Sequence, residues 1–340
     1  MTNNEMRTRA RNHFIADCGW HDSQVIALKG DASFRRYFRL RRPNGESVML
    51  MDAPPPHNDT QPFVTVARGL KTAGLSAPQV LVARIDEGFL LLEDLGDLTY
   101  SRALRDGQSE ARLYRAATQS CLAIQTRKPL DLAALPDYDW ELYLREVRLF
   151  TDWYLPAHGV SLGDSAVSEY EAIWRSLLQP ILAAPRVLVL RDFHVDNLMV
   201  LPQGGVAGVG LLDFQDAVGG HRLYDLVSLL DDARRVVSPA VVRGEADYFC
   251  QQLGQEPADF ERDFAILSLQ RNFKILGIFV RLAVRDGKSH YLEFIPHLWQ
   301  LVACRIDHPS ASGFKAWLDR HCPPPLRQQP QPAANPRDRP

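Results

Sequence analysis

The sequence has little that would direct the protein to a membrane or to nucleic acid. Its 340 residues contain no run of about 18 apolar residues, and the N-terminus lacks the apolar core of a signal peptide. We therefore expect no membrane span and a cytoplasmic location. The net charge of −2, from 39 basic and 41 acidic residues, lacks the basic excess of a nucleic-acid-binding protein. Nothing in the pattern indicates more than a monomer.

The chain is also poor in cysteine. It has five, an odd number, and no two of them are spaced as Cys-x-x-Cys. This excludes a disulfide framework and favours the reduced thiols of a cytosolic protein. What is present instead is ordinary for a globular protein, with 46% hydrophobic and 24% charged residues. The length suffices for two domains or for one large domain with two lobes.

The most informative stretch is residues 187–216. A short apolar run that reads as a buried strand ends at Leu190, and Asp192 follows it. Two further apolar stretches, 198–201 and 206–212, are separated by a Gly-rich turn and predict a hairpin. This hairpin would bring Asn197 and Asp213 together at one end, with Asp192 five residues before Asn197.

These three side chains suit phosphoryl transfer. An Asn amide oxygen and a carboxylate are ligands that Mg²⁺ accepts, together with nucleotide phosphates. A further carboxylate, Asp192, can accept the proton of an attacking hydroxyl. The alternative is an exposed loop with ordinary turn residues. It does not explain why position, spacing and flanking strands all agree with a phosphotransferase loop.

The N-terminal third is rich in predicted strands. Asn44-Gly45 lies between two apolar runs and predicts a hairpin. An earlier turn contains Gly30, Ala32 and Ser33, whose small side chains would let backbone N–H groups approach phosphates. That turn carries a single Gly, so a plain β-turn is an equally good interpretation.

Two charges usual in a phosphotransferase of this kind are missing. Met51 stands where a strand would carry a phosphate-holding Lys, and the next predicted helix, 61–73, has no acidic partner for one. Losing both together avoids an uncompensated charge. Arg35 or Arg36 could supply the positive charge instead, but side chains alternate along a strand, so only one of them can point inward. Solvated arginines at a strand edge are the alternative.

The change from strands to helices after residue 93 marks a boundary between two lobes and indicates an α+β fold. Because Asp192, Asn197 and Asp213 follow the order of kinase catalytic loops, their resemblance implies that this fold is protein-kinase-like. The small N-terminal lobe would be mainly antiparallel β-sheet, and the larger C-terminal lobe would be helical. The last 18 residues hold seven prolines and are expected to be disordered. The predicted boundaries are 1–93 for the nucleotide-binding lobe, 94–97 for the hinge, 98–322 for the catalytic and substrate-binding lobe, and 323–340 for the tail.

Several side chains of the helical lobe are candidates for holding an acceptor. Glu146 or Trp153, on a predicted helix over 139–155, could face the cleft, although core packing or a solvated face is the alternative. Arg271, with Lys274 on a helix over 258–286, could reach an anionic group. His194 and Asp225 are expected to brace the catalytic loop.

The sequence then resembles a known group. The blocks LRDFHVDN and LLDF look like the aminoglycoside phosphotransferase and choline kinase superfamily. Further blocks, GDASFRRYFR, MDAPP, FLLLEDLGD and QRNFKILGIFVRL, resemble the anomeric sugar kinases of peptidoglycan recycling. The resemblance covers roughly residues 10–320. This chain departs from the general kinase pattern by Leu190 for His, by Gln215 for Gly and by the missing Lys–Glu pair.

The resemblance implies ATP-dependent phosphorylation of N-acetylmuramate and N-acetylglucosamine at C1, by direct in-line transfer. Asp192 would be the general base, and Asn197 and Asp213 would hold Mg²⁺. It also implies that backbone groups at Glu93, Asp94 and Leu95 bind the base. Arg191 and Asp216 are further candidates for the acceptor site. Two alternatives remain: a kinase of another acceptor (an aminoglycoside, choline or homoserine), or a pseudokinase that only binds a nucleotide.

Overall fold

The structure is a computed structural model that describes residues 3–28, 35–55 and 59–330. The chain divides into two compact units, each built from two segments. Unit 1 comprises the residues up to Ala134 together with Val195–Ala217. Unit 2 comprises Leu135–His194 together with the residues from Val218 onward. These units do not coincide with the predicted lobes, which stay a prediction.

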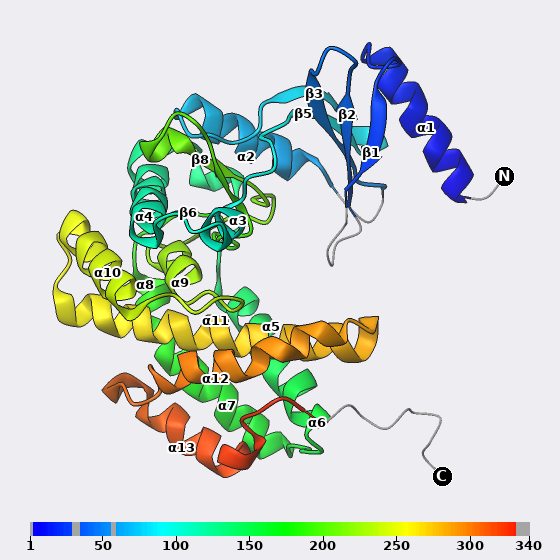
Figure 1. Ribbon diagram of the computed structural model, residues 1–340. Helices are drawn as coiled ribbons and strands as arrows, with labels where there is room; N and C mark the ends of the chain where they lie inside the picture. Colours follow the sequence, from blue (N-terminus) through cyan, green and yellow to red (C-terminus); the bar gives the residue numbers. More distant parts are fainter. Residues whose placement is uncertain (1–2, 29–34, 56–58, 331–340) are drawn as a thin grey trace, which may run out of the picture. The chain divides into compact units, whose positions relative to one another are not determined.

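Unit 1 is built on a five-stranded antiparallel sheet (Figure 1). Sharp turns at Gly45 and Gly88, whose φ angles are +91° and +68°, join neighbouring strands. The turn at Gly45 is the one predicted from Asn44-Gly45. In spatial order the strands are β1 (Gln24–Ala27), β2 (Arg36–Arg41), β3 (Ser47–Asp52), β5 (Phe89–Glu93) and β4 (Val80–Arg84).

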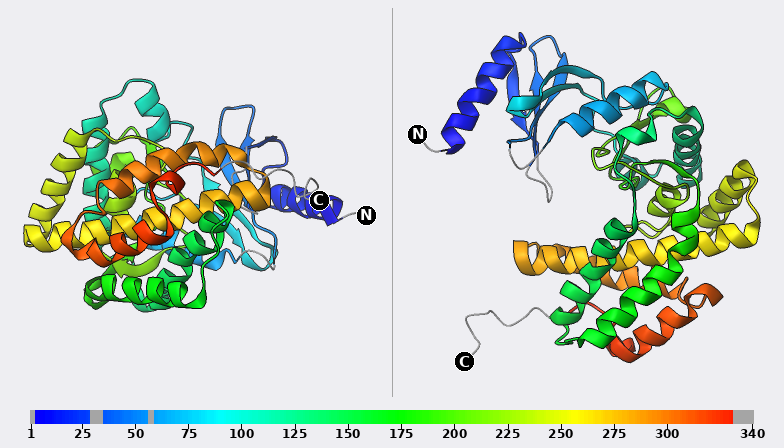
Figure 2. Two further views of the ribbon diagram at one scale, coloured as in Figure 1. Left: turned by 90° about the horizontal axis from the view of Figure 1, so that it is seen from below. Right: turned by 180° about the vertical axis from the view of Figure 1, so that it is seen from behind.

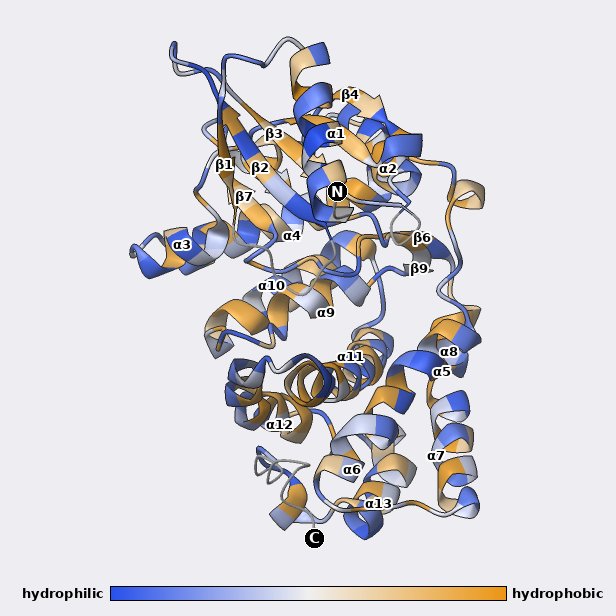
Figure 3. Cartoon of the chain, turned by 90° about the vertical axis from the view of Figure 1, so that its right-hand side faces the viewer, coloured by the Kyte–Doolittle hydropathy of each residue, from blue (hydrophilic) through white to orange (hydrophobic). Residues whose placement is uncertain are grey.

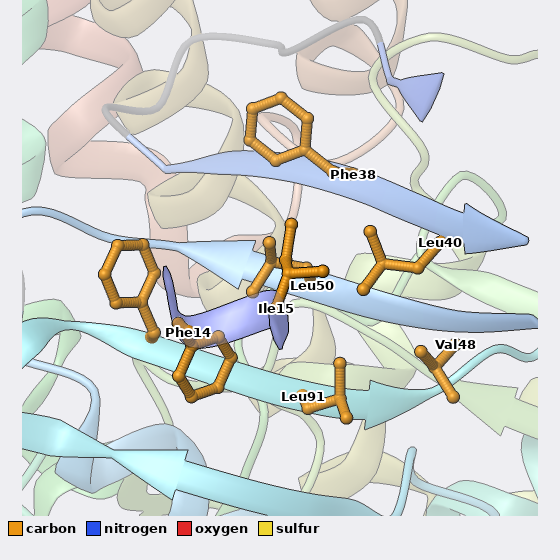
Figure 4. Packing of buried hydrophobic residues seen from close by; sticks show 8 residues of the cluster. Phe14, Ile15, Phe38, Leu40, Val48, Leu50 and Leu91 are labelled. Carbon is orange, nitrogen blue, oxygen red and sulfur yellow. The ribbon is translucent and has the colours of Figure 1, made fainter. Parts of the chain in front are cut away.

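Alternation of side chains gives this sheet two different faces. One face is apolar and is covered by helix α1 (Asn3–Asp17), as Figure 4 shows for most of the cluster. The buried cluster consists of Phe14, Ile15, Phe38, Leu40, Val48, Leu50, Phe89 and Leu91. Each large apolar side chain buried in this way contributes roughly 1.5–3 kcal/mol. The opposite face carries Tyr37, Arg39 and Met49 and borders a cavity.

The remainder of unit 1 is helical, with one small hairpin. Its helices are α2 (Gln61–Thr72), α3 (Tyr100–Arg105) and α4 (Glu110–Arg127). Thr99 and Ser109 cap α3 and α4 by accepting backbone N–H bonds. The hairpin pairs β7 (Leu198–Val200) with β8 (Val209–Leu211). The predicted strand over 206–212 is therefore too long at its start, because residues 205–208 form a 3₁₀ turn.

The hairpin explains why the units do not follow the predicted lobes. Val200 donates its backbone N–H to Leu98 O, and Leu211 donates to Ser76 O. These main-chain bonds tie residues 195–217 to the N-terminal segment rather than to the helices that follow it in the chain. Helix α4 also packs against the turn between β7 and β8.

Unit 2 is mainly helical and is organised around α11 (Pro257–Asp286), which lies alongside α5 and α12 (Figures 1 and 2). Phe273, in the middle of α11, packs edge-on against Phe150, Trp174 and Trp299. The other helices are α5 (Trp140–Leu149), α6 (Leu155–Ala157), α7 (Asp164–Leu177), α8 (Gln179–Ala183), α9 (Tyr224–Leu230), α10 (Pro239–Leu253), α12 (Ile295–Ala303) and α13 (Ser312–His321). A two-stranded sheet pairs β6 (Arg186–Val189) with β9 (Val218–His221).

The helices of unit 2 show two local features. Between α5 and α6 the helix widens into a π-helical turn over Phe150–Tyr154. Along α7, hydrophobic and hydrophilic residues alternate, and Tyr170, Trp174 and Leu177 form its buried side (Figure 3).

None of the helices in the described ranges is both long and apolar enough to cross a bilayer. All five cysteines are free thiols.

The expectation of a disordered tail from residue 323 is wrong for its first part. Pro324–Leu326 form a 3₁₀ turn, and Arg327 pairs with Asp319. The Tyr154 hydroxyl lies 2.7 Å from the carbonyl oxygens of both Leu326 and Gln328. These contacts hold the start of the proline-rich segment against the π-helical turn of unit 2. Residues 331–340 lie outside the described part.

Candidate active site

Unit 1 contains a cavity of about 440 Å³ against the sheet face that carries Tyr37, Arg39 and Met49. Met49 and Leu92 from the sheet, with Met199 and Leu212 from the β7–β8 hairpin, form apolar walls. Asn197 and Asp213, from the two ends of that hairpin, also line it. An apolar slot with a few polar groups at one side is the usual form of a nucleotide or small-molecule site.

The segment after β5 borders this cavity and is held by Arg39. The Arg39 guanidinium lies 2.7 Å from carboxylate oxygens of both Asp94 and Asp97, and 3.0 Å from Gly96 O. Burial would raise the pKa of Asp94, but its hydrogen bond from Arg39 holds it below the ordinary value. Among the described residues, none bonds to the main-chain N–H of Leu95, which leaves it for a ligand.

The β7–β8 register sets Asn197 and Asp213 at one end of the hairpin, as predicted. Leu212 donates its backbone N–H to Asn197 O at 3.0 Å, so Asp213 follows directly. Asp213 has a φ of +56°, a left-handed conformation unusual for a residue with a side chain. Gln215 donates to the carboxylates of both Asp213 and Asp216, at 2.9 and 3.1 Å.

This donor set fits a hard cation such as Mg²⁺. Asn197 and Asp213 offer an amide and a carboxylate on one cavity, and the Asp213 side chain is 48% exposed. In the chain as described, no group of three His, Cys, Asp or Glu side chains could hold a metal. A cation at this place would complete its shell with water and nucleotide phosphates, which is how Mg²⁺ is usually bound.

The catalytic-loop half of the predicted site begins in unit 2, where Asp192 follows β6. Asp225, near the start of α9, accepts the backbone N–H groups of Leu190 and Arg191 at 2.8 and 2.9 Å. Arg191 has a φ of +71°, so this turn is strained and needs such support. The geometry is the bracing expected of Asp225.

Asp192 lies among positive charges. Burial would raise its pKa, but Lys274 and Arg271, with His194 and Arg191, outweigh that effect and hold the pKa of Asp192 below its ordinary value. The carboxylate is therefore ionised at neutral pH and able to accept a proton.

Comparison with known proteins shows the family of this chain. Residues 24–262 match the phosphotransferase enzyme family. The chain belongs to this family. It is 35% identical to an N-acetylmuramate/N-acetylglucosamine kinase of Caulobacter vibrioides, over 95% of this chain and 99% of that protein. Proteins of the same name from Pseudomonas aeruginosa and Neisseria meningitidis are each 38% identical, over 86% and 81% of this chain and 87% and 83% of their own lengths.

Solved structures confirm the fold of this phosphotransferase. A choline/ethanolamine kinase family protein from Mesorhizobium loti has a TM-score of 0.61 at 14% identity, covering 94% of this chain and all of that one. Amicoumacin kinase hAmiN, solved with AMP-PNP and Ca²⁺, has the same score and identity over 89% of this chain and 96% of its own. The protein-kinase-like α+β fold, predicted from the order of strands and helices and from the likeness to kinase loops, is correct.

Two predicted residues of this phosphotransferase lie differently from expectation. Arg36, a candidate for phosphate binding, pairs with buried Asp52 at 2.9 Å on the sheet face covered by α1 and does not line the cavity. Arg35, one residue earlier, faces the cavity. Glu146 was expected to face an acceptor, but only 4% of it is exposed.

Glu146 is held by four donors in unit 2. Lys274 and Gln270, one turn apart on α11, lie 2.8 and 2.9 Å from it, and Arg191 and the Tyr138 hydroxyl also contact it. Burial would raise the pKa of Glu146, but Lys274 and Arg191 lower it below its ordinary value. Glu146 is therefore paired with Arg191 and Lys274, two of the cations that lower the pKa of Asp192.

The other predicted site residues are placed as follows. Arg271 is 4% exposed and donates a hydrogen bond to Arg191 O at 3.1 Å. Burial lowers the pKa of His194, and the backbone N–H of His194 donates to Asp192 O. Trp153 is partly buried in the π-helical turn, and Asp216 is exposed near Arg35. The Glu93 side chain bonds to Lys71. Gly30, Ala32 and Ser33 lie outside the described residues.

Sequence reasoning missed the Arg39 pairs with Asp94 and Asp97 and the partners of Glu146. The available signal was spacing: Gln270 and Lys274 are four residues apart and share one side of a helix. What the spacing could not reveal is that a carboxylate from α5 meets that side.

Proposed function

We propose that this phosphotransferase transfers the γ-phosphoryl group of ATP to the anomeric C1 hydroxyl of N-acetylmuramate and N-acetylglucosamine. The observation that carries the proposal is the 35% identity to a kinase of that name over 99% of its length. The relatives from Pseudomonas aeruginosa and Neisseria meningitidis have the same name. The proposed donor also fits the cytoplasmic location expected from the sequence.

In this proposal Asp192 orients the sugar hydroxyl and accepts its proton as the oxygen attacks phosphorus. The cations around Asp192 keep it ionised, and they also favour an acceptor with a carboxylate, as N-acetylmuramate has. Asn197 and Asp213 would hold Mg²⁺, which when bound offsets charge on the nucleotide phosphates. No covalent intermediate on the protein is required.

The nucleotide base would lie between the apolar walls of the unit 1 cavity, with the main chain at Asp94 and Leu95 along its edge. The cavity volume suits a ligand of that size. A single chain supplies every residue of the proposed site, so a monomer suffices for the reaction.

The direct test is phosphorus NMR of the protein with Mg-ATP and either sugar. We expect a new sugar 1-phosphate resonance. Asp192→Asn should lower turnover by on the order of a hundred- to ten-thousandfold if the carboxylate is the general base. Asp196→Asn, an exposed carboxylate in the same loop, is the matched control and should retain turnover within about twofold.

Other outcomes would redirect the proposal. A phosphate on a different sugar hydroxyl would retain the kinase and contradict the anomeric assignment. No transfer to either sugar, despite binding of Mg-ATP, would point to another acceptor such as an aminoglycoside, choline or homoserine. Failure with all acceptors would indicate a nucleotide-binding pseudokinase.

A further inference from the structure

We propose that Arg35 holds the phosphates of the nucleotide, taking the place of the Lys that β3 lacks. The inference rests on the proposed binding of ATP in the unit 1 cavity, but not on the identity of the acceptor. It is carried by the two faces of the sheet, by the partners of each cavity-lining arginine, and by the distance from Arg35 to the predicted metal ligands.

The first step is that β3 offers no cation to the cavity. In the β2–β3 register, Tyr37 lies opposite Met51 and Arg39 opposite Met49. Met49 lines the cavity, and Met51, two residues later, shares its face. Met51 is 1% exposed, so a thioether is buried where a Lys would stand. A thioether cannot offset phosphate charge, so the cation must come from another strand.

The second step concerns the two arginines that line the cavity, Arg35 and Arg39. Arg39 is 7% exposed and is engaged with Asp94, Asp97 and Gly96 O at 2.7–3.0 Å. Moving it would leave the buried Asp94 carboxylate without its ion-pair partner, which is costly. Arg35 is the other cation among the described lining residues.

The third step is where Arg35 lies. Its guanidinium is 3.7 Å from the Asp213 carboxylate and 3.8 Å from that of Asp216. Both distances exceed the 2.7–2.9 Å of a charge-assisted hydrogen bond, so these ion pairs are loose. Once Asp213 holds a metal ion, its charge is offset by that ion. Phosphates held by such an ion would then compete with Asp216 for Arg35, and a guanidinium can bind two phosphate oxygens at once.

The chain supplies a matched control in the next residue. Arg36 has the same side chain, but it pairs with Asp52 on the face covered by α1. Replacing Arg36, the first residue of β2, removes the same charge one position along the chain, from a side chain that does not line the cavity. Arg35→Met and Arg36→Met remove the same charge from opposite faces of the sheet, and in Arg36→Met the buried Asp52 keeps Arg7 as its partner.

The test is isothermal titration of adenosine, ADP and ATP, each with Mg²⁺ and without sugar, into wild type, Arg35→Met, Arg35→Lys and Arg36→Met. Arg35→Met should weaken ADP and ATP binding about tenfold to a hundredfold, because a hydrogen bond to a charged group is lost. Its adenosine affinity should stay within twofold. Arg35→Lys should recover part of the loss, and Arg36→Met should bind all three ligands as wild type does.

The result that overturns the proposal is an Arg35→Met variant that binds ADP and ATP as tightly as wild type. An equal loss for adenosine would also overturn it, since the residue would then shape the base pocket instead. A wild type that binds no nucleotide would sink this proposal and the proposed function together. A wild type that binds ATP but phosphorylates neither sugar would contradict the proposed acceptor alone. The role of Arg35 would then still be decided by the titration.

Discussion

At the residue scale, the proposed base depends on charges supplied by a distant helix. Lys274 and Arg271 are on α11, and they hold the pKa of Asp192 below its ordinary value against the effect of burial. A carboxylate with a lowered pKa is ionised over the whole neutral range. The lowered pKa also makes the Asp192 carboxylate a weaker base.

We expect Lys274→Met to move the acidic limb of kcat/KM to higher pH, because losing this cation raises the pKa of Asp192. The measurement is a pH profile of sugar phosphorylation. Lys274 also pairs with buried Glu146, so the single variant leaves that carboxylate less compensated. The double variant Lys274→Met/Glu146→Gln removes both charges and should show the same shift with better folding. An unmoved acidic limb in both variants would contradict this role for Lys274.

Asp225 leads to a prediction about stability. Burial raises its pKa to about 7, although the N–H groups of Leu190 and Arg191 favour the ionised form. A carboxyl whose folded pKa exceeds its unfolded value of 3.8 stabilises fully below that value, and this contribution is lost as pH rises through about 7.

Wild type should therefore lose on the order of 2 kcal/mol more unfolding free energy between pH 5 and pH 8 than Asp225→Asn does. Urea denaturation at the two pH values measures both. Equal losses in the two proteins would mean that Asp225 is ionised throughout.

At the scale of elements, α11 and the end of α5 pack closely around a glycine. A Cβ at Gly277 would lie 2.2 Å from the backbone carbon of Leu149, immediately before the π-helical turn. Backbone at that distance cannot move aside as a flexible side chain could. The glycine is therefore needed for the two helices to approach.

Gly277→Ala should cost about 1–3 kcal/mol of unfolding free energy, as overpacking typically does. Gly244→Ala is the control, since Gly244 lies inside α10 and an added Cβ there meets nothing within 4 Å. That control should gain about 0.5–1 kcal/mol from helix propensity. Chemical denaturation of both variants decides the matter, and a stable Gly277→Ala would show that α11 can shift.

How much could be predicted also depends on the element. The strands and turns of the sheet followed from alternation and Asn44-Gly45, and the hairpin carrying Asn197 and Asp213 followed from its Gly-rich turn. These are local signals. The choice between Arg35 and Arg36 and the burial of Glu146 could not be predicted, because they depend on α1 covering one sheet face and on α11 meeting α5. No spacing within one segment records such contacts.

At the scale of the whole molecule, each compact unit needs a segment from elsewhere in the chain. A fragment of residues 1–134 contains the sheet but lacks β7 and β8, and with them Asn197 and Asp213. We expect this fragment to unfold without cooperativity and to bind no ADP in a calorimetric titration. Joining residues 195–217 to it through a flexible Gly-Ser linker should restore both properties. A 1–134 fragment that binds ADP on its own would contradict this expectation.

The interleaving of segments also constrains the order in which the protein forms during synthesis. A ribosome releases the sheet early, but the hairpin that completes unit 1 emerges only after Leu135–His194, which belong to unit 2. Leu98 and Ser76, whose carbonyls accept the N–H groups of the hairpin, must therefore wait unpaired until Ala217, in the second half of the chain, has been made. The nucleotide cavity is consequently a late product of translation, and chains stalled before Ala217 should be the ones that need a chaperone.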